Sequence, residues 1–164
     1  RSQYGRDYVC AIPNNLYGPH DNFDLNNGHV IPSVVRKIWE AKTSGKPPVF
    51  WGDGSPLREF TYSEDIAAAL LFILKNYSSS MPINIGCTNE ISIEEVVQTA
   101  CELLNYDGNV LWDTGMPKGQ HRKPSSNSRF KKLGWKEKDY TGFRAGMRKT
   151  IDWFVEAYPN VRGI

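Results

Sequence analysis

The chain has 164 residues, of which 40% are hydrophobic, and 20 lysines and arginines stand against 18 acidic residues. This length suits one domain or a large part of one, and the apolar fraction supports a core. The nearly balanced charge predicts no nucleic-acid surface. No apolar run has the length of a membrane span, so we expect no membrane partner.

The cysteines indicate a reducing environment. Cys10, Cys87 and Cys101 are widely spaced and form no Cys-x-x-Cys pair, so we expect neither a metal site nor a disulfide framework. We therefore predict a cytoplasmic protein. Cys10 and Cys101 lie in apolar runs and are predicted to be core residues. Cys87 follows a predicted strand, where it would be buried or would meet a ligand.

The first third of the chain reads as strand, loop and helix. Residues 8–12 form an apolar run that ends at a proline, which predicts a buried strand. Residues 13–27 are rich in Asn, Pro and Gly and predict a loop. A helix is expected from His29 to just before Gly45, because one apolar stripe recurs at helical spacing at Ile31, Val34, Val35 and Ile38.

The middle of the chain predicts two short strands, at 48–51 and 59–62, separated by a turn rich in Gly and Pro. Ser63, followed by two acidic residues, suits the start of a helix. Residues 66–74 of that helix are almost wholly apolar. This composition predicts a helix buried on most sides.

The last part predicts strands at 82–86 and 110–112 and helices that begin at Ser92 and at Arg144. Ser92 and Glu95 have the spacing of a capping box. Strands that alternate with helices predict an α/β fold with a mainly parallel or mixed sheet and flanking helices. The strands are few and short for a complete doubly wound sheet, so we expect half of a two-lobed protein.

His29 is the first candidate for chemistry. A histidine can both donate and accept a proton near neutral pH, and the start of a helix favours anionic ligands nearby. The structural alternative is a histidine that caps the helix or lies in the core.

Trp51 and Arg58 are the second candidate pair. Nucleotide sugars need a flat surface for the base or ribose and cations for the diphosphate, and Arg matches phosphate geometry. The alternative is a β-hairpin with a core Trp and a surface Arg. Lys37 lies eight residues after His29 and so shares its helix face. Lys37, and Arg122 with Lys123, would reach a phosphate or simply be solvated.

Residues 13–16 close the first predicted strand. In open α/β sheets ligands bind beyond the carboxyl ends of strands, so Asn14 or Asn15 would meet a cofactor there. The alternative is an ordinary turn.

Several segments together resemble one known family. These are 15–23 (Asn-Leu-Tyr-Gly-Pro-His-Asp-Asn-Phe), 29–32 (His-Val-Ile-Pro), the Trp-Gly at 51–52 with Pro56 and 58–60, and the stretch from Arg122-Lys123 to 133–135. They resemble the GDP-L-fucose synthases, which are NADP-dependent epimerase-reductases of the extended short-chain dehydrogenase/reductase family. The likeness runs from about Tyr8 to the final helix.

The resemblance implies an activity and a set of roles. The family converts GDP-4-keto-6-deoxy-D-mannose to GDP-L-fucose by 3,5-epimerisation and reduction of the 4-keto group with NADP(H), and the whole enzyme is expected to be a homodimer. His29 matches the acid of the epimerisation and also a contact to the cofactor. The remaining matches are Pro13, Asn14, Asn15 and Leu16 for the nicotinamide side of NADP, and Lys37, Trp51, Arg58 and Lys123 for the GDP moiety.

The resemblance also implies a division of the chain. Residues 1–18 would be the last strand and exit loop of a Rossmann domain, and residues 19–164 the domain that binds the nucleotide sugar. The chain has no Gly-rich nucleotide loop and no Tyr-x-x-x-Lys pair. We therefore expect a C-terminal, substrate-binding portion that is inactive alone and exposes apolar runs such as 8–12. Lys118 stands where family members commonly carry Asp.

Two other readings stay open. One is another epimerase or dehydratase of the extended family that acts on a different nucleotide sugar, which base preference would distinguish. The other is a non-catalytic module that binds nucleotides.

Overall fold

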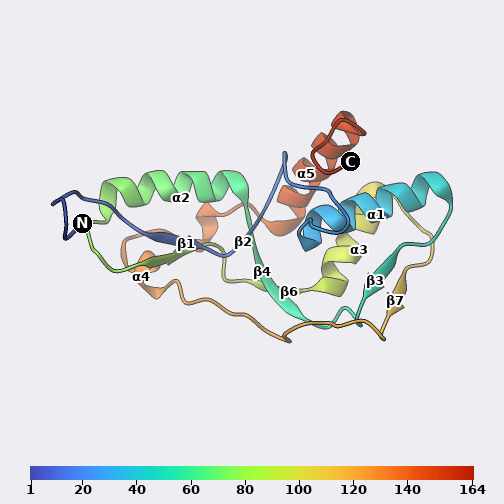
Figure 1. The fold of residues 1–164 in the computed structure, drawn as a ribbon, viewed down its shortest axis with the longest axis horizontal. Helices are drawn as coiled ribbons and strands as arrows, with labels where there is room; N and C mark the ends of the chain where they lie inside the picture. The colour runs from blue at the N-terminus through green and yellow to red at the C-terminus, as the bar shows by residue number, and fades with distance from the viewer.

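The computed structural model describes residues 1–164, which form an elongated α/β structure (Figure 1). The strands are β1 (Ala11–Pro13), β2 (Asn15–Tyr17), β3 (Val49–Trp51), β4 (Leu57–Tyr62), β5 (Ile83–Ile85), β6 (Glu90–Ser92) and β7 (Leu111–Asp113). The helices are α1 (Val30–Ser44), α2 (Ser63–Asn76), α3 (Ile93–Leu104), α4 (Ser128–Lys132) and α5 (Phe143–Ala157), with a 3₁₀ turn at Glu137–Asp139.

The strands form three small sheets. β1 pairs with β5 and β3 pairs with β7, both in parallel. β4 lies between β2, to which it is parallel, and β6, to which it is antiparallel. The predicted α/β class and mixed pairing are therefore confirmed. β4 is the longest strand, and Figure 1 shows it running between the two ends of the molecule.

The structure has two hydrophobic clusters. The larger has 18 buried residues, drawn mainly from α1, α3, α5 and the loop before α1. The smaller has six buried residues from α2, β5 and α4. The larger cluster includes Phe60 and Tyr62 of β4, and α2, which carries part of the smaller cluster, begins directly after β4.

The prediction of a buried strand at 8–12 is wrong. The strand is shorter and later, at β1, and Tyr8 and Ile12 are 66% and 48% exposed. A buried parallel strand needs a neighbour on each side and a layer on each face. β1 has one neighbour, β5. Cys10, predicted to be a core residue, is exposed for the same reason, whereas Cys101 is half-buried against the larger cluster.

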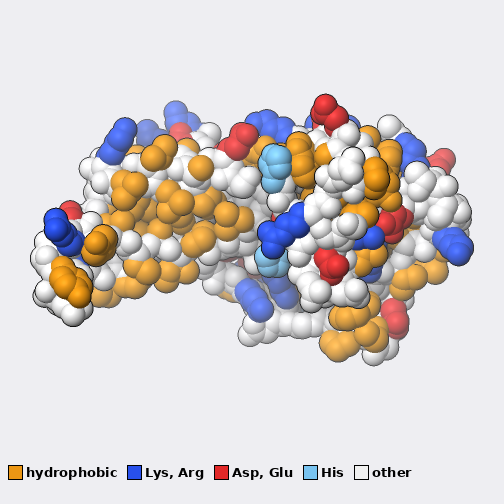
Figure 2. Space-filling model, turned by 45° about the horizontal axis from the view of Figure 1, so that its top comes forward, with side chains coloured by type: hydrophobic (Ala, Val, Ile, Leu, Met, Phe, Trp, Pro, Cys, Tyr) orange, Lys and Arg blue, Asp and Glu red, His pale blue; other side chains and the backbone are white.

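The expectation that α2 is buried on most sides is also wrong. Only Ile66, Ala69 and Ile73 are buried in it, while Leu71 and Leu74 are 61% and 69% exposed. One face of the helix packs on the smaller cluster and the other carries leucines on the surface. Figure 2 shows hydrophobic side chains gathered over this end of the molecule. The predicted exposure of apolar runs is confirmed at Tyr8 and Ile12, and the leucines of α2 are exposed as well.

Two short strands were not predicted. β2 lies inside the segment read as a loop, and β6 ends at Ser92, the N-cap of α3. Each has three residues and pairs only with β4. Such strands carry too little periodicity to be recognised in a sequence, because the pairing partner determines them.

The ends of α1 follow from the sequence. His29 is the N-cap residue with extended backbone, and Gly45 ends the helix in the left-handed conformation at φ 72°. Glycine adopts this conformation without steric cost. No helix of the structure is both long enough and apolar enough to cross a membrane.

The predicted capping box of α3 is confirmed, and it provides a stability test. The Ser92 hydroxyl accepts from the Glu95 N–H at 3.1 Å, and the Glu95 carboxylate accepts from the Ser92 N–H at 2.7 Å. We expect Ser92→Ala to lower the free energy of unfolding by about 1 kcal/mol in urea titrations. Ser80→Ala, at an exposed bend, is the control and is expected to change it little.

The same capping box predicts a pH dependence. Hydrogen bonds from Ser92, backbone first, lower the pKa of Glu95 in the folded chain. A lowered folded pKa means that the stabilisation is complete above the unfolded value of about 4.3 and declines as pH falls through the folded one. The Ser92→Ala penalty should therefore shrink below about pH 4. An equal penalty at pH 3 and pH 7 would contradict this.

Candidate functional site

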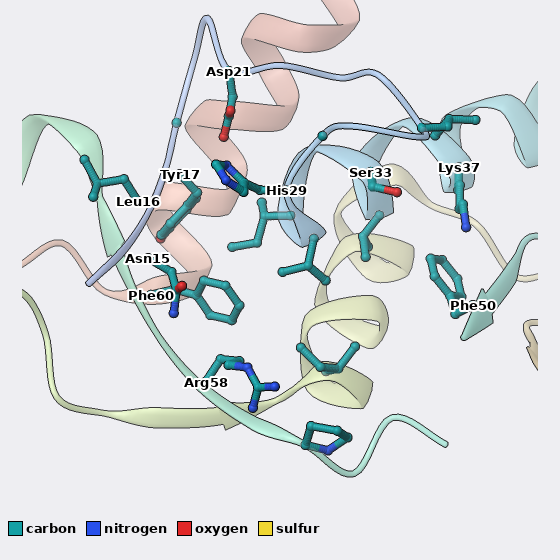
Figure 3. Close-up of a pocket in the computed structure, with 18 of the residues that line it drawn as sticks. Asn15, Leu16, Tyr17, Asp21, His29, Ser33, Lys37, Phe50, Arg58 and Phe60 are labelled. Atoms are coloured by element: carbon teal, nitrogen blue, oxygen red, sulfur yellow. The ribbon is translucent and has the colours of Figure 1, made fainter. Parts of the chain in front are cut away.

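A cavity of about 810 Å³ lies where the loop before α1, the start of α1 and the strands β3 and β4 meet (Figure 3). Seven predicted site residues from three separate segments line the cavity: Asn14, Asn15, Leu16, His29, Lys37, Trp51 and Arg58. The fold therefore brings together residues that lie more than 40 positions apart in the chain. The cavity is large enough for a nucleotide-sized ligand.

His29 lies at the N-terminus of α1 and its side chain makes no capping hydrogen bond. The histidine is exposed and lines the cavity. Figure 3 shows its ring beside the carboxylate of Asp21, with Arg58 across the cavity. His29 therefore occupies the N-cap position, but its side chain neither caps the helix nor lies in the core. The position beside the helix N-terminus favours a negatively charged group near the ring.

Lys37 lies two turns further along the same face of α1, as its spacing from His29 predicts. Its Nζ donates to the Val49 carbonyl oxygen at 2.8 Å and lies 5.3 Å from the centre of the Phe50 ring. Burial lowers the pKa of this amine. Lys37 is thus a half-buried cation fixed on β3 at the wall of the cavity, rather than a freely solvated lysine.

Trp51 and Arg58 both line the cavity, but they do not form the hairpin given as the structural alternative. β3 pairs with β7, and β4 pairs with β2 and β6, so the two strands are not partners. Trp51 is 61% exposed and is no core residue. The Arg58 Nη1 donates to the Leu57 carbonyl oxygen at 2.6 Å, and Figure 3 shows the guanidinium directed into the cavity.

Residues 13–16 lie at the junction of β1 and β2, beside β4. The Asn14 amide is fully engaged: its Oδ1 accepts from Thr61 at 2.7 Å and its Nδ2 donates to the Cys87 carbonyl at 2.7 Å. A Cβ at Gly86 would overlap this amide. Asn15 and Leu16 are exposed at the cavity, whereas Pro13 lies in β1 outside the wall.

The basic residues at 122–123 do not belong to the wall of the cavity. Arg122 forms an ion pair with Glu90, and Lys123 is exposed and does not line the cavity. Lys118 does line it, and its Nζ lies 2.9 Å from the Asp53 carboxylate. Hydrogen bonds from Ser55 and then Lys118 lower the pKa of Asp53. The Lys118–Asp53 ion pair thereby joins the turn after β3 to the loop that follows β7.

Sequence reasoning missed several residues of this region. Asp21 and Phe60 line the cavity, and Glu59 and Thr61 lie buried behind it. The sequence carried a weak indication of these β4 residues, since the predicted strand that follows Arg58 runs through 59–61.

Cys87 is half-buried, and burial raises the pKa of its thiol, so it is a protonated thiol at neutral pH. No group of His, Cys, Asp and Glu has the arrangement of a metal site.

Comparison with known proteins identifies the family. The profile of the NAD dependent epimerase/dehydratase family matches residues 1–86, more than half of the chain. The chain belongs to this family. The matched residues carry most of the cavity wall, so the match covers the site as well as the fold.

Particular members of the NAD dependent epimerase/dehydratase family are similar over almost the whole chain. GDP-L-fucose synthase of Sinorhizobium fredii is 44% identical over 156 residues, which cover 94% of this chain and 49% of that protein. Probable GDP-L-fucose synthase 1 of Oryza sativa is 40% identical, covering 95% and 47%. The crystal structure of a GDP-L-fucose synthetase from Naegleria fowleri bound to NADP is 40% identical with a TM-score of 0.89, covering 94% and 48%. The chain spans about half the length of the relatives it matches.

Proposed function

We propose that this chain is the substrate-binding portion of an NADP-dependent GDP-L-fucose synthase, which converts GDP-4-keto-6-deoxy-D-mannose to GDP-L-fucose. The observation that carries the proposal is the single cavity lined by an acid–base residue, His29, by the cations Lys37 and Arg58, and by the flat ring of Trp51. Relatives that bear this name are up to 44% identical over 94% of the chain.

The chemistry of the substrate explains these residue types. The 4-keto group acidifies the C–H bonds at C3 and C5, because the carbanion that forms is an enolate. Epimerisation then removes a proton from one face and returns one to the other, which requires a group that donates a proton near neutral pH. We assign this role to His29. Arg58 and Lys37 would bind the diphosphate, and Trp51 the base or ribose.

The residues at the β1–β2 junction fit the nicotinamide end of NADP(H). Asn15 and Leu16 are exposed there, beyond the carboxyl end of a parallel strand, where ligands of open α/β sheets bind. Bound NADPH supplies the hydride for reduction of the 4-keto group. We propose that Asn15 and Leu16 contact it directly and that Asn14 and Pro13 shape the backbone around it, with His29 nearby.

The other roles in the proposal concern Lys123 and the whole protein. Lys123 is proposed to reach the diphosphate when the nucleotide is bound. Residues 1–18 are proposed to belong to a dinucleotide-binding unit and 19–164 to the substrate unit, and the whole enzyme is proposed to be a cytoplasmic homodimer.

Calorimetric titration of the chain with GDP and with UDP tests the proposal. We expect GDP to bind about tenfold more tightly, because guanine offers a larger ring system to Trp51 than uracil does. Trp51→Ala should reduce this preference, while Tyr4→Ala, at an exposed aromatic residue outside the cavity, should leave it unchanged. Equal binding of GDP and UDP would favour another nucleotide-sugar enzyme of the family.

A further inference from the structure

Glu59 is a buried carboxylate that the proposed reaction does not use. It is 2% exposed and follows Arg58 in β4. Successive side chains of a strand point to opposite faces, so Arg58 faces the cavity and Glu59 points away from it. A buried carboxylate is costly unless hydrogen bonds satisfy it. Its partners therefore indicate its role.

These partners come from two different parts of the site. Ser125 donates twice, from its backbone N–H to Oε1 at 3.0 Å and from its hydroxyl to Oε2 at 2.6 Å. The Asn14 Nδ2 lies 3.4 Å from Oε2, and the Asn15 Nδ2 donates to the Glu59 carbonyl oxygen at 2.7 Å. Glu59 thus joins the β1–β2 junction to the segment 121–125.

Segment 121–125 contacts Arg58. The Leu57 N–H donates to the His121 carbonyl oxygen at 2.8 Å, and the Arg58 Nη1 lies 3.5 Å from the same oxygen. Arg122 pairs with Glu90, which lies opposite Glu59 in the β4–β6 register. The segment is therefore held on β4 at His121 and at Ser125, and on β6 at Arg122.

Lys123 lies between the second and third of these attachments. Displacement of the Ser125 end would move both Lys123 and the carbonyl that contacts Arg58. No cation contacts the Glu59 carboxylate, and its hydrogen bonds all come from neutral groups. Its arrangement fits an anchor for the segment rather than a group that binds an anionic ligand.

We propose that Glu59 is a positioning residue: through Ser125 it fixes segment 121–125 on β4 and so sets the placement of Arg58 and Lys123 for a nucleoside diphosphate. This inference rests on the proposed function, because it names the same ligand class. It adds Glu59, on the face of β4 opposite Arg58, to the residues that determine the affinity for a nucleoside diphosphate.

The first measurement needs no ligand. In Glu59→Gln the Ser125 backbone N–H and hydroxyl lose a charged acceptor, so amide hydrogen exchange of Ser125 and Leu57 is expected to accelerate about tenfold. Exchange in the middle of α1, at Val35, should not change. Glu64→Gln, at an exposed glutamate of α2, is the matched control. Unchanged exchange at Ser125 and Leu57 would overturn the inference.

The second measurement is calorimetric affinity for GDP at a temperature where all variants are folded. Glu59→Gln is expected to bind about fivefold more weakly, and the same substitution in an Arg58→Ala, Lys123→Ala background less than about twofold, because the effect passes through these two cations. A purely structural role would give equal factors in both backgrounds. Equal factors, or unchanged affinity in Glu59→Gln, would overturn the inference.

Ser125→Ala and Ser125→Thr keep the test decisive if Glu59→Gln does not fold. The alanine variant removes the hydroxyl and should reproduce the faster exchange and weaker GDP binding, and the threonine variant should restore both. If the unaltered chain binds no GDP, the proposed function fails and the ligand part of this inference with it. The exchange data would then still show whether Glu59 anchors the segment, so the two failures are distinguishable.

Discussion

Replacing Arg58 by alanine is expected to weaken GDP binding by about 10- to 100-fold in calorimetric titrations. Hydrogen bonds between charged groups contribute roughly 1.5–3 kcal/mol, and 1.4 kcal/mol corresponds to a factor of ten. The hydrogen bonds of Arg58 use only Nη1 and go to main-chain oxygens, while the guanidinium faces the cavity. A guanidinium carries five N–H donors, so it has donors for a diphosphate as well.

Two further variants separate charge from geometry at this position. Arg58→Lys keeps the charge but loses the planar pair of donors, so we expect an affinity between those of the unaltered chain and Arg58→Ala. Arg144→Ala is the matched control, because Arg144 is exposed on α5 and pairs with Glu102. If Arg58→Ala and Arg144→Ala bind GDP equally well, Arg58 does not contact the diphosphate.

Replacing Phe23 by alanine is expected to lower the free energy of unfolding by about 3–5 kcal/mol, as for other fully buried aromatic residues. Phe23 is completely buried, and its ring centroid lies 4.5 Å from that of Phe154. Its N–H donates to the Arg162 carbonyl oxygen at 2.8 Å, and its carbonyl accepts from Arg36 at 3.0 Å. Phe23 therefore fixes the loop before His29 to α1 and to the C-terminal residues.

Urea denaturation at neutral pH measures this effect. Tyr4→Ala is the control, because Tyr4 is an aromatic residue that is 71% exposed, and it should change the free energy of unfolding by less than about 0.5 kcal/mol. If Phe23→Ala costs no more than Tyr4→Ala, the loop is not anchored by this ring. In that case its position at the cavity has another origin.

Much of the site was predictable because its signals are local. Helix α1 has a single apolar stripe and ends at a glycine, and this alone places His29 and Lys37 on one face. The turn after Trp51 contains two buried glycines with positive φ, which few other residues tolerate. Segments of this kind determine their own backbone, so their residues could be assigned before the structure.

The predictions are wrong where neighbouring elements determine whether a segment is buried or forms a strand. The apolar run at 8–12 predicts burial, but burial requires layers on both faces, and these residues have a single paired strand beside them. The leucines of α2 show the same effect, because composition states how apolar a helix is and not how many of its sides are covered. The short strands β2 and β6 form only because β4 lies between them.

The sequence by itself determined the α/β class, the helix ends and the residue types of the proposed acid–base and diphosphate-binding site. These depend on periodicity, capping and side-chain chemistry, which act within one or two turns of chain. Only the tertiary structure decided that His29, Trp51 and Arg58 share one cavity, that Lys123 lies outside its wall, and that Glu59 is buried on the other face of β4. Those facts depend on pairing between strands far apart in the chain, and residue spacing does not encode that pairing.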